Sequence, residues 1–236
     1  MKPASLQVEI AGHALVLSSL RAAFDPALRC LFVADAHFGK DAVFRARGVP
    51  VPVGSTADNL MRLDILIAEF EPSTLVFLGD LLHAREAHAD EMLNALHVWR
   101  ARHAALRVVL VEGNHDRHAG ALPATLNVDY VQEPWRTGPW ALCHHPQNVE
   151  GAYALAGHLH PVYRIATRND SVRVPCFRFG PATRRIARIW QLYRRCTRRR
   201  PSQWRKGLSR RSREGDRGAS LIVRAAHGCV VLSYVS

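Results

Sequence analysis

The sequence contains few cysteines and no long apolar run. Its five cysteines, Cys30, Cys143, Cys176, Cys196 and Cys229, are scattered and odd in number, and no two form a C-x-x-C pair. This pattern argues against a disulfide framework and a structural zinc ribbon, so we expect reduced and mostly buried thiols. No apolar stretch approaches the roughly 20 residues that span a bilayer, and residues 1–10 lack the long apolar core of a signal peptide. We therefore expect a cytoplasmic protein with no membrane partner.

Acidic residues are scarce at one end of the chain. Residues 1–180 carry 17 Lys and Arg against 18 Asp and Glu, a net charge of −1, whereas residues 181–236 carry 15 against 2, a net charge of +13. The near-neutral larger part therefore gives no compositional sign of a nucleic-acid substrate. With 236 residues, 48% of them apolar, the chain can form one globular domain. We expect a catalytic domain over residues 1–180 and a disordered, Arg-rich tail over 181–236.

Short apolar segments alternate with amphipathic ones along the near-neutral part. Strands are predicted at residues 6–10 and 14–17 as a hairpin, then at 30–34, Thr74–Leu78, Arg107–Val111, Trp140–Cys143, Tyr153–Ala156 and 172–179. Helices are predicted at 56–70, with Ser55 as the N-cap, and at 90–103. Helices placed between strands are typical of an α/β core.

Five of the predicted strands end in clusters of Asp, Asn or His. The clusters are Asp35-Ala36-His37, Gly79-Asp80, Gly113-Asn114-His115-Asp116, His144-His145 and Gly157-His158-Leu159-His160. Ligands bind outside the carboxyl ends of the strands in open α/β sheets, so we expect these clusters to meet at one edge. In the D-x-H and H-x-H spacings, both side chains of an extended strand end point to the same face.

The clusters offer carboxylate, amide and imidazole groups and no thiolate. This set suits Mn²⁺, Fe or Zn²⁺ rather than Ca²⁺ or an iron–sulfur cluster. Each cluster has a plain alternative, because D-x-H occurs by chance, G-D is a common turn, and His144-His145 can be a satisfied buried pair. Five clusters in this order, each at a strand end, are not expected by chance. We interpret them as one metal site.

The ordered motifs D-x-H, G-D, G-N-H-D, H and G-H-x-H resemble those of the calcineurin-like metallophosphoesterases over about residues 34–161. The resemblance implies a single α/β domain, built as a sandwich of two mixed β-sheets flanked by helices. It implies two metal ions, one held by Asp35, His37 and His160, the other by Asn114, His144 and His158, with Asp80 bridging both. The fourth motif departs from the family, where Gly usually follows the His. The ligand is therefore assigned to His144, and the role of His145 stays open.

Two residues are predicted to act beside the metal ions. Cations about 3.5–4 Å apart lower the pKa of a water between them and bind phosphate oxygens. By the resemblance, His115 contacts the phosphate and protonates the leaving oxygen. Asp116 is expected to hold the tautomer of His115, the usual role of a carboxylate behind a histidine.

Further segments resemble one bacterial branch, the ligase-associated DNA damage response endonucleases, over about residues 5–180. The segments are Phe38-Gly39-Lys40, residues 44–52 and residues 79–84. The resemblance implies Mn²⁺-dependent endonuclease or phosphodiesterase activity on DNA, with a DNA ligase, a helicase and an exonuclease-like protein as partners. Candidate contacts to substrate phosphates flank the metal motifs at Lys40, Arg45, Arg47 and His83. The plain alternative for each is a solvated charge or, for His83, a packed side chain.

Two other functions stay open. A phosphomonoesterase or nucleotide pyrophosphatase that acts on a small molecule would carry the same metal motifs. A basic nucleic-acid-binding module with an inactive metal site would rely on the Arg-rich tail and its phosphate contacts.

The composition changes abruptly after Phe179. Related proteins continue with a Pro-Ala-Phe-Gly-x-Phe-Thr-Gly-Gly stretch that is absent here. Residues 186–195 can be written with permitted codons as ATC GCC CGC ATT TGG CAA CTT TAC AGG CGG, which one base later encode Ser-Pro-Ala-Phe-Gly-Asn-Phe-Thr-Gly-Gly. We hypothesise a frame shift between residues 179 and 186, so residues 221–223 and 229–235 are expected to lie outside the native sheet although they are apolar. An intact frame around codons 178–188 would contradict the hypothesis.

Overall fold

Seven strands form the first sheet of the protein. The computed structural model describes residues 3–51, 54–85, 90–166, 171–179, 186–188, 220–226 and 229–235. The strand order is β1 (Ser5–Ile10), β2 (His13–Ser18), β3 (Ala22–Asp25), β4 (Cys30–Val33), β5 (Thr74–Leu78), β6 (Arg107–Val111) and β7 (Val128–Val131). Pairing is antiparallel from β1 to β4 and parallel from β4 to β7. The carboxyl ends of β4, β5 and β6 therefore share one edge.

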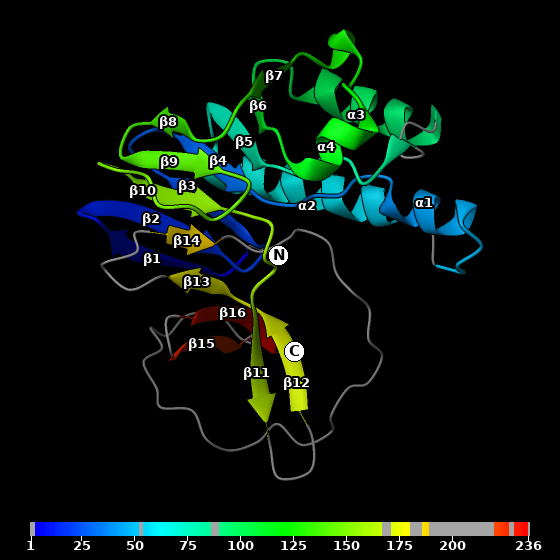
Figure 1. The fold of residues 1–236 in the computed structure, drawn as a ribbon. Helices are drawn as coiled ribbons and strands as arrows, with labels where there is room; N and C mark the ends of the chain where they lie inside the picture. Colours follow the sequence, from blue (N-terminus) through cyan, green and yellow to red (C-terminus); the bar gives the residue numbers. More distant parts are fainter. Residues whose placement is uncertain are drawn as a thin grey trace.

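A second sheet of seven strands lies against the first (Figure 1). Its order is β15 (Ser220–Ala226), β16 (Cys229–Val235), β13 (Phe177–Phe179), β14 (Ile186–Arg188), β10 (Tyr153–Ala156), β9 (Trp140–Cys143) and β8 (Trp135–Thr137). β10 pairs in parallel with both β9 and β14, and the other pairs are antiparallel. A separate two-stranded sheet contains β11 (Val162–Ala166) and β12 (Ser171–Pro175).

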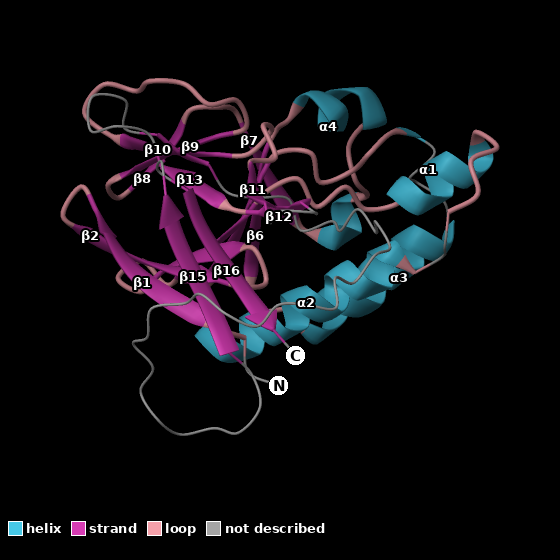
Figure 2. Ribbon diagram, turned by 90° about the horizontal axis from the view of Figure 1, so that it is seen from below, coloured by secondary structure: helices cyan, strands magenta, loops and turns pink. Residues whose placement is uncertain are grey.

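The helices gather on one side of the molecule, as Figure 2 shows. They are α1 (Lys40–Ala46), α2 (Ser55–Phe70), α3 (Asp90–Arg102), α4 (Asn114–Ala119) and the 3-10 helix η2 (Ala124–Leu126). In the described part of the chain, no helix is long and apolar enough to cross a membrane.

Strand β4 shows how the layers pack. Leu31 and Val33 point into the core between the first sheet and the helices, where Leu63 of α2 is fully buried. Phe32 points the other way, into the core between the two sheets, where it joins Trp140. This alternation follows from the two-residue period of a strand. The predicted α/β sandwich of two mixed sheets with flanking helices is confirmed.

Most predicted elements lie where the sequence places them, with two corrections. The N-cap of α2 is Gly54 rather than Ser55, because the helix begins one residue earlier than predicted, at Ser55. Gly54 has a left-handed φ of 103°, and its N–H donates to a carboxylate oxygen of Asp41 at 3.1 Å. The single strand expected at 172–179 is two strands, β12 and β13. They are separated at Cys176, whose N–H donates to the carbonyl of Pro161 at 3.1 Å.

Three strands belong to the Arg-rich segment. β16 pairs with β13 and β15, and β14 lies between β13 and β10. The expectation that residues 221–223 and 229–235 lie outside the sheet is therefore wrong, because the backbone of β16 pairs with β13 and that of β15 pairs with β16. The remaining residues between 180 and 219 lie outside the described residues. The frame-shift hypothesis stays a prediction.

Candidate metal centre

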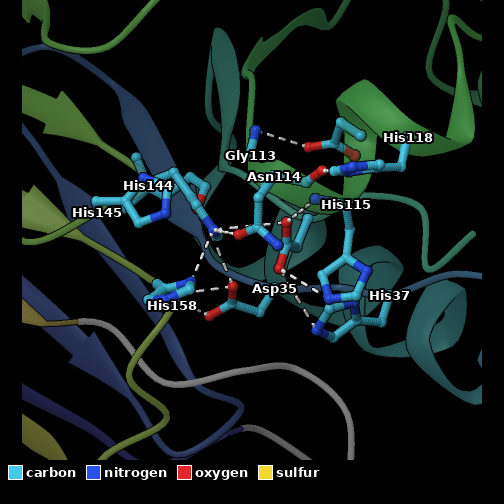
Figure 3. Close-up of polar contacts among 12 residues, drawn as sticks. Asp35, His37, Gly113, Asn114, His115, His118, His144, His145 and His158 are labelled. Atoms are coloured by element: carbon cyan, nitrogen blue, oxygen red, sulfur yellow. Dashed lines mark hydrogen bonds and ion pairs between the residues drawn. The ribbon is translucent and has the colours of Figure 1, made fainter.

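The five polar clusters converge at the carboxyl edge of the strands. Asp35 and His37 follow β4, Asp80 follows β5, Asn114 begins α4 after β6, His144 follows β9, and His158 and His160 follow β10. Figure 3 shows Asp35, Asn114, His144 and His158 turned toward a common centre, with His37 and His115 on the opposite side of it. Residues up to 125 positions apart in the sequence are thus neighbours, as His160 and Asp35 are.

Five of the expected ligands have a left-handed backbone. The φ angle is 49° at Asp35, 46° at His37, 51° at Asp80, 68° at His158 and 41° at His160. A non-glycine residue in this region costs about 1–2 kcal/mol, so the surrounding packing must hold each one in place. The expected extended strand ends are therefore wrong. The chain turns at each D-x-H or H-x-H segment, and the turn aims the side chains.

Two glycines let backbone pass directly against ligand side chains. A Cβ at Gly79 would lie 2.1 Å from Nδ1 of His144, and a Cβ at Gly113 would lie 2.4 Å from Oδ1 of Asp80. Both distances are far below any allowed contact between heavy atoms. The G in the G-D and G-N-H-D motifs is therefore required by close approach.

Four side chains form one group of potential ligands. Nε2 of His144 lies 2.9 Å from Oδ1 of Asn114, 3.0 Å from Nδ1 of His158 and 3.5 Å from Oδ1 of Asp80. Neighbouring ligands of an octahedral cation with bonds of about 2.1 Å stand roughly 3 Å apart. The spacing of these atoms therefore fits one divalent cation.

The hydrogen-bond partners of the His144 imidazole also indicate a cation at this group. Its Nδ1 lies 3.2 Å from the carbonyl oxygen of Leu78, and its Nε2 faces the amide oxygen of Asn114. A neutral imidazole has a single N–H and cannot donate to both oxygens. Burial lowers the pKa of His144, so a second proton is disfavoured. A cation on Nε2 removes the conflict between the two acceptors.

A second group of potential ligands lies on the other side of Asp80. Nδ1 of His160 stands 3.4 Å from Oδ2 of Asp35, and Nε2 of His37 stands 3.9 Å from Oδ2 of Asp80. Burial, and then the charge of Asp80, raise the pKa of Asp35 well above its usual range. Burial, and then Lys40, lower the pKa of His160 to about 4 and that of His37 further. Neutral imidazoles beside two close carboxylates fit a second divalent cation.

His115 lies at the open side of these groups. Its side chain is 39% exposed, and its Nε2 lies 4.0 Å from Oδ2 of Asp80. Its Nδ1 lies 2.8 Å from the carbonyl oxygen of His83, so Nδ1–H donates there and Nε2 faces the site. The ring of His83 stacks on that of His115 at 5.0 Å and meets His37 edge to face at 5.2 Å.

The role expected for Asp116 needs correction. Its carboxylate accepts the N–H of Gly113 at 3.0 Å and the N–H of Leu82 at 3.1 Å, and not the imidazole of His115. Burial raises the pKa of Asp116 to about 6. Asp116 therefore joins the loops after β5 and β6, while the carbonyl of His83 holds the tautomer of His115.

The predicted phosphate contacts separate into two kinds. Lys40 begins α1, with Nζ 5.9 Å from the ring of Phe44, and its charge is close enough to lower the pKa values of the site's histidines. His83 also lies in the site, and burial lowers its pKa to about 4. Arg45 instead forms an ion pair with Asp41 at 3.3 Å. Arg47 is exposed just after α1.

One residue at the site, Glu133, was not predicted from the sequence. One carboxylate oxygen accepts the N–H groups of His144 and His145 at 2.7 and 2.8 Å, and the other lies 2.8 Å from Nδ1 of His145. Burial alone would raise the pKa of Glu133, but the hydrogen bonds from His145 and His144 lower it. Glu133 follows β7 in no recognisable motif, so only the fold reveals it. His145 itself lies beside His144 and His158, with nitrogens within 4.8 Å of theirs.

Comparison with known proteins agrees with this geometry. The family described as calcineurin-like phosphoesterase matches residues 28–216. A solved structure of nuclease MPE from Pseudomonas putida is 38% identical, covers 85% of this chain and 94% of that chain, and superposes with a TM-score of 0.72. No curated protein matches. The match to the family covers most of the chain, so the protein belongs to the calcineurin-like phosphoesterases and is a metal-dependent hydrolase of phosphoesters.

Proposed function

We propose that this phosphoesterase is an endonuclease or phosphodiesterase that acts on DNA, in a ligase-associated repair system of the cytoplasm. The observation that carries the proposal is the 38% identity to a nuclease over nearly the whole of that protein. The segments Phe38-Gly39-Lys40, 44–52 and 79–84 support the same branch. A DNA ligase, a helicase and an exonuclease-like protein are the partners that this branch implies.

The proposal assigns ligands for two divalent ions. Asp35, His37 and His160 hold one, Asn114, His144 and His158 hold the other, and Asp80 lies between them with one carboxylate oxygen toward each group. We propose Mn²⁺ as the ion, with Fe or Zn²⁺ as alternatives that the same donor set accepts. When bound, such a pair supplies a nucleophile from water at neutral pH and neutralises charge on the phosphate.

Side chains of the protein then transfer the proton and bind the substrate. The carbonyl of His83 holds Nδ1–H of His115, so Nε2 faces the site. In the imidazolium form, Nε2 gives its proton to the leaving oxygen, and the neutral ring that remains keeps Nδ1–H. Lys40 and His83 are the proposed contacts to the phosphate, because the charge of Lys40 acts on His37 and the ring of His83 stacks on that of His115. Arg45 would have to leave the buried carboxylate of Asp41 to do so, which makes it a weaker candidate than Lys40 or His83.

A hydrolysis panel tests the proposal. Purified protein with Mn²⁺ is offered bis-p-nitrophenyl phosphate and supercoiled plasmid as diesters, and p-nitrophenyl phosphate and nucleotides as the alternative substrates. Asp80→Asn is the inactive control. We expect diester hydrolysis and plasmid nicking that EDTA abolishes. Turnover confined to monoesters or nucleotides would support the small-molecule phosphatase instead.

A further inference from the structure

A hairpin extends from the edge of the metal centre. β11 and β12 pair with each other along their whole length and, within the described ranges, with neither seven-stranded sheet. β11 begins two residues after His160, and the bond from Cys176 N–H to the Pro161 carbonyl closes its base. Figure 1 shows the two strands as an arm that runs away from the helices. The arm is thus joined directly to a proposed metal ligand.

Two arginines face each other on this arm. Arg164 of β11 lies directly opposite Arg173 of β12, and both are exposed. Directly opposite residues of an antiparallel pair share a face with their Cβ atoms about 4.5–5.5 Å apart, where like charges are destabilising. In the part of the chain that the structure describes, neither guanidinium forms a hydrogen bond or an ion pair. The repulsion is therefore not offset within these residues, and an anion between the two side chains would offset it.

Exposed apolar side chains lie at the base of the arm, one between the ligands His158 and His160 and one at the start of β11. Leu159 is 48% exposed and Val162 is 47% exposed. Val162 lies two residues before Arg164 and so on the same face of β11. From the centre outward, the arm therefore offers apolar surface first and positive charge next. That order suits sugars or bases followed by a phosphate.

The length of the arm separates a polymer from a small substrate. At about 3.4 Å per residue, the backbone of Arg164 lies up to roughly 14 Å from that of His160. When the phosphate of a nucleotide or small monoester lies on the metal ions, the substrate has no second anion at that distance. A nucleic-acid strand has a phosphate at every residue and can occupy both places.

We propose that Arg164 and Arg173 bind the phosphate backbone of a DNA strand a few nucleotides away from the bond that is hydrolysed. Leu159 and Val162 contact the sugars or bases in between. A planar guanidinium matches two oxygens of a phosphate at once, which suits this role better than an ammonium group. The inference rests on the proposed function, that the metal centre hydrolyses DNA.

The test uses a double variant and a matched control in the full chain. Arg164→Ala/Arg173→Ala removes the arm's charge. Arg102→Ala/Arg107→Ala removes the same charge from two exposed arginines at the end of α3 and the start of β6, away from the carboxyl edge. Each protein is titrated without metal into a fluorescein-labelled 30-nucleotide strand and its duplex over a range of NaCl. Hydrolysis of bis-p-nitrophenyl phosphate with Mn²⁺ is measured separately.

We expect the arm variant to keep its turnover of the small diester within about twofold, because the metal centre is intact. Its Kd for DNA should rise about 10- to 100-fold at low salt, and the slope of log Kd against log salt should fall by about one to two units. Arg164→Lys/Arg173→Lys should lie in between, and the control should match the wild type.

Two failures are distinguishable. If the arm variant has the same DNA affinity and salt slope as the control variant, the proposed role of the arm is wrong, whatever its turnover of bis-p-nitrophenyl phosphate. It is also wrong if the wild-type protein hydrolyses the small diester but does not bind DNA. A wild-type protein that hydrolyses neither bis-p-nitrophenyl phosphate nor plasmid DNA contradicts the proposed function. The binding titration still measures the contribution of the arm.

Discussion

Replacing Gly79 by Ala places a methyl group where the imidazole of the proposed metal ligand His144 lies. The new Cβ would lie 2.1 Å from Nδ1, 2.5 Å from Cγ and 2.8 Å from Cβ of His144. His144 is completely buried, and its Nδ1 lies 3.2 Å from the carbonyl oxygen of Leu78. The substitution must therefore displace the imidazole or the end of β5. Either displacement opens the group formed with Asn114 and His158.

The free-energy cost of placing Ala at a left-handed φ can be measured separately from the clash with His144. Gly79 has φ +78°, where Ala costs about 1–2 kcal/mol. Gly12 has φ +80°, and nothing that the structure describes lies within 4 Å of a Cβ built there. Gly12→Ala therefore carries the backbone cost without the clash. At about 2–4 °C per kcal/mol, we expect it to lower Tm by roughly 2–8 °C.

Metal stoichiometry and turnover show the difference between the two variants. We expect Gly12→Ala to bind two Mn²⁺ per chain and to hydrolyse bis-p-nitrophenyl phosphate at the wild-type rate. Gly79→Ala should bind one ion or none by elemental analysis, and its kcat should fall at least about 100-fold, since the ligand sphere is broken. Two bound ions and near-normal kcat in Gly79→Ala would refute the close-approach argument.

Three further outcomes follow from the site. His115→Ala should lower kcat by about 10²–10⁴-fold with metal content unchanged; a variant with normal turnover would remove His115 from proton transfer. Glu133→Ala should weaken binding of one metal ion by about 10- to 100-fold in a calorimetric titration, whereas Glu133→Gln, which still accepts backbone N–H groups, should lose less; equal losses would point to charge alone. Treatment with EDTA should lower the stability by about 2.7 kcal/mol for each ion removed, relative to protein at 100 times the metal Kd, seen as a fall in Tm of roughly 5–11 °C per ion; an unchanged Tm would mean that the ions do not stabilise the fold.

The sequence predicted the strands and the convergence of the motifs well, for a physical reason. A buried strand such as Thr74–Leu78 is a short apolar run, and the polar residues that follow it must lie at the sheet edge. The conformation of those residues was not predictable in this way. Asp35 and His37 look like the end of an extended strand, yet both are left-handed, and their N–H groups donate to the carbonyls of Gly79 and Asp80 in the loop after β5.

Contacts between distant loops account for what the sequence did not reveal. Glu133 has no motif, and its partners lie in the loop after β9. Asp116 follows a histidine, which suggests a carboxylate behind an imidazole, but its carboxylate is taken by the N–H groups of Gly113 and Leu82. Backbone donors are invisible in a sequence, so a role assigned from neighbouring side chains alone was wrong here.

The central claim is that one edge of this fold holds two divalent ions on either side of Asp80. Anomalous diffraction at the manganese edge, from crystals grown with Mn²⁺, tests it most directly. We predict two peaks about 3.5–4 Å apart, both in contact with Asp80, one near His37 and His160 and the other near His144 and His158. A single peak, or peaks away from Asp80, would contradict the account.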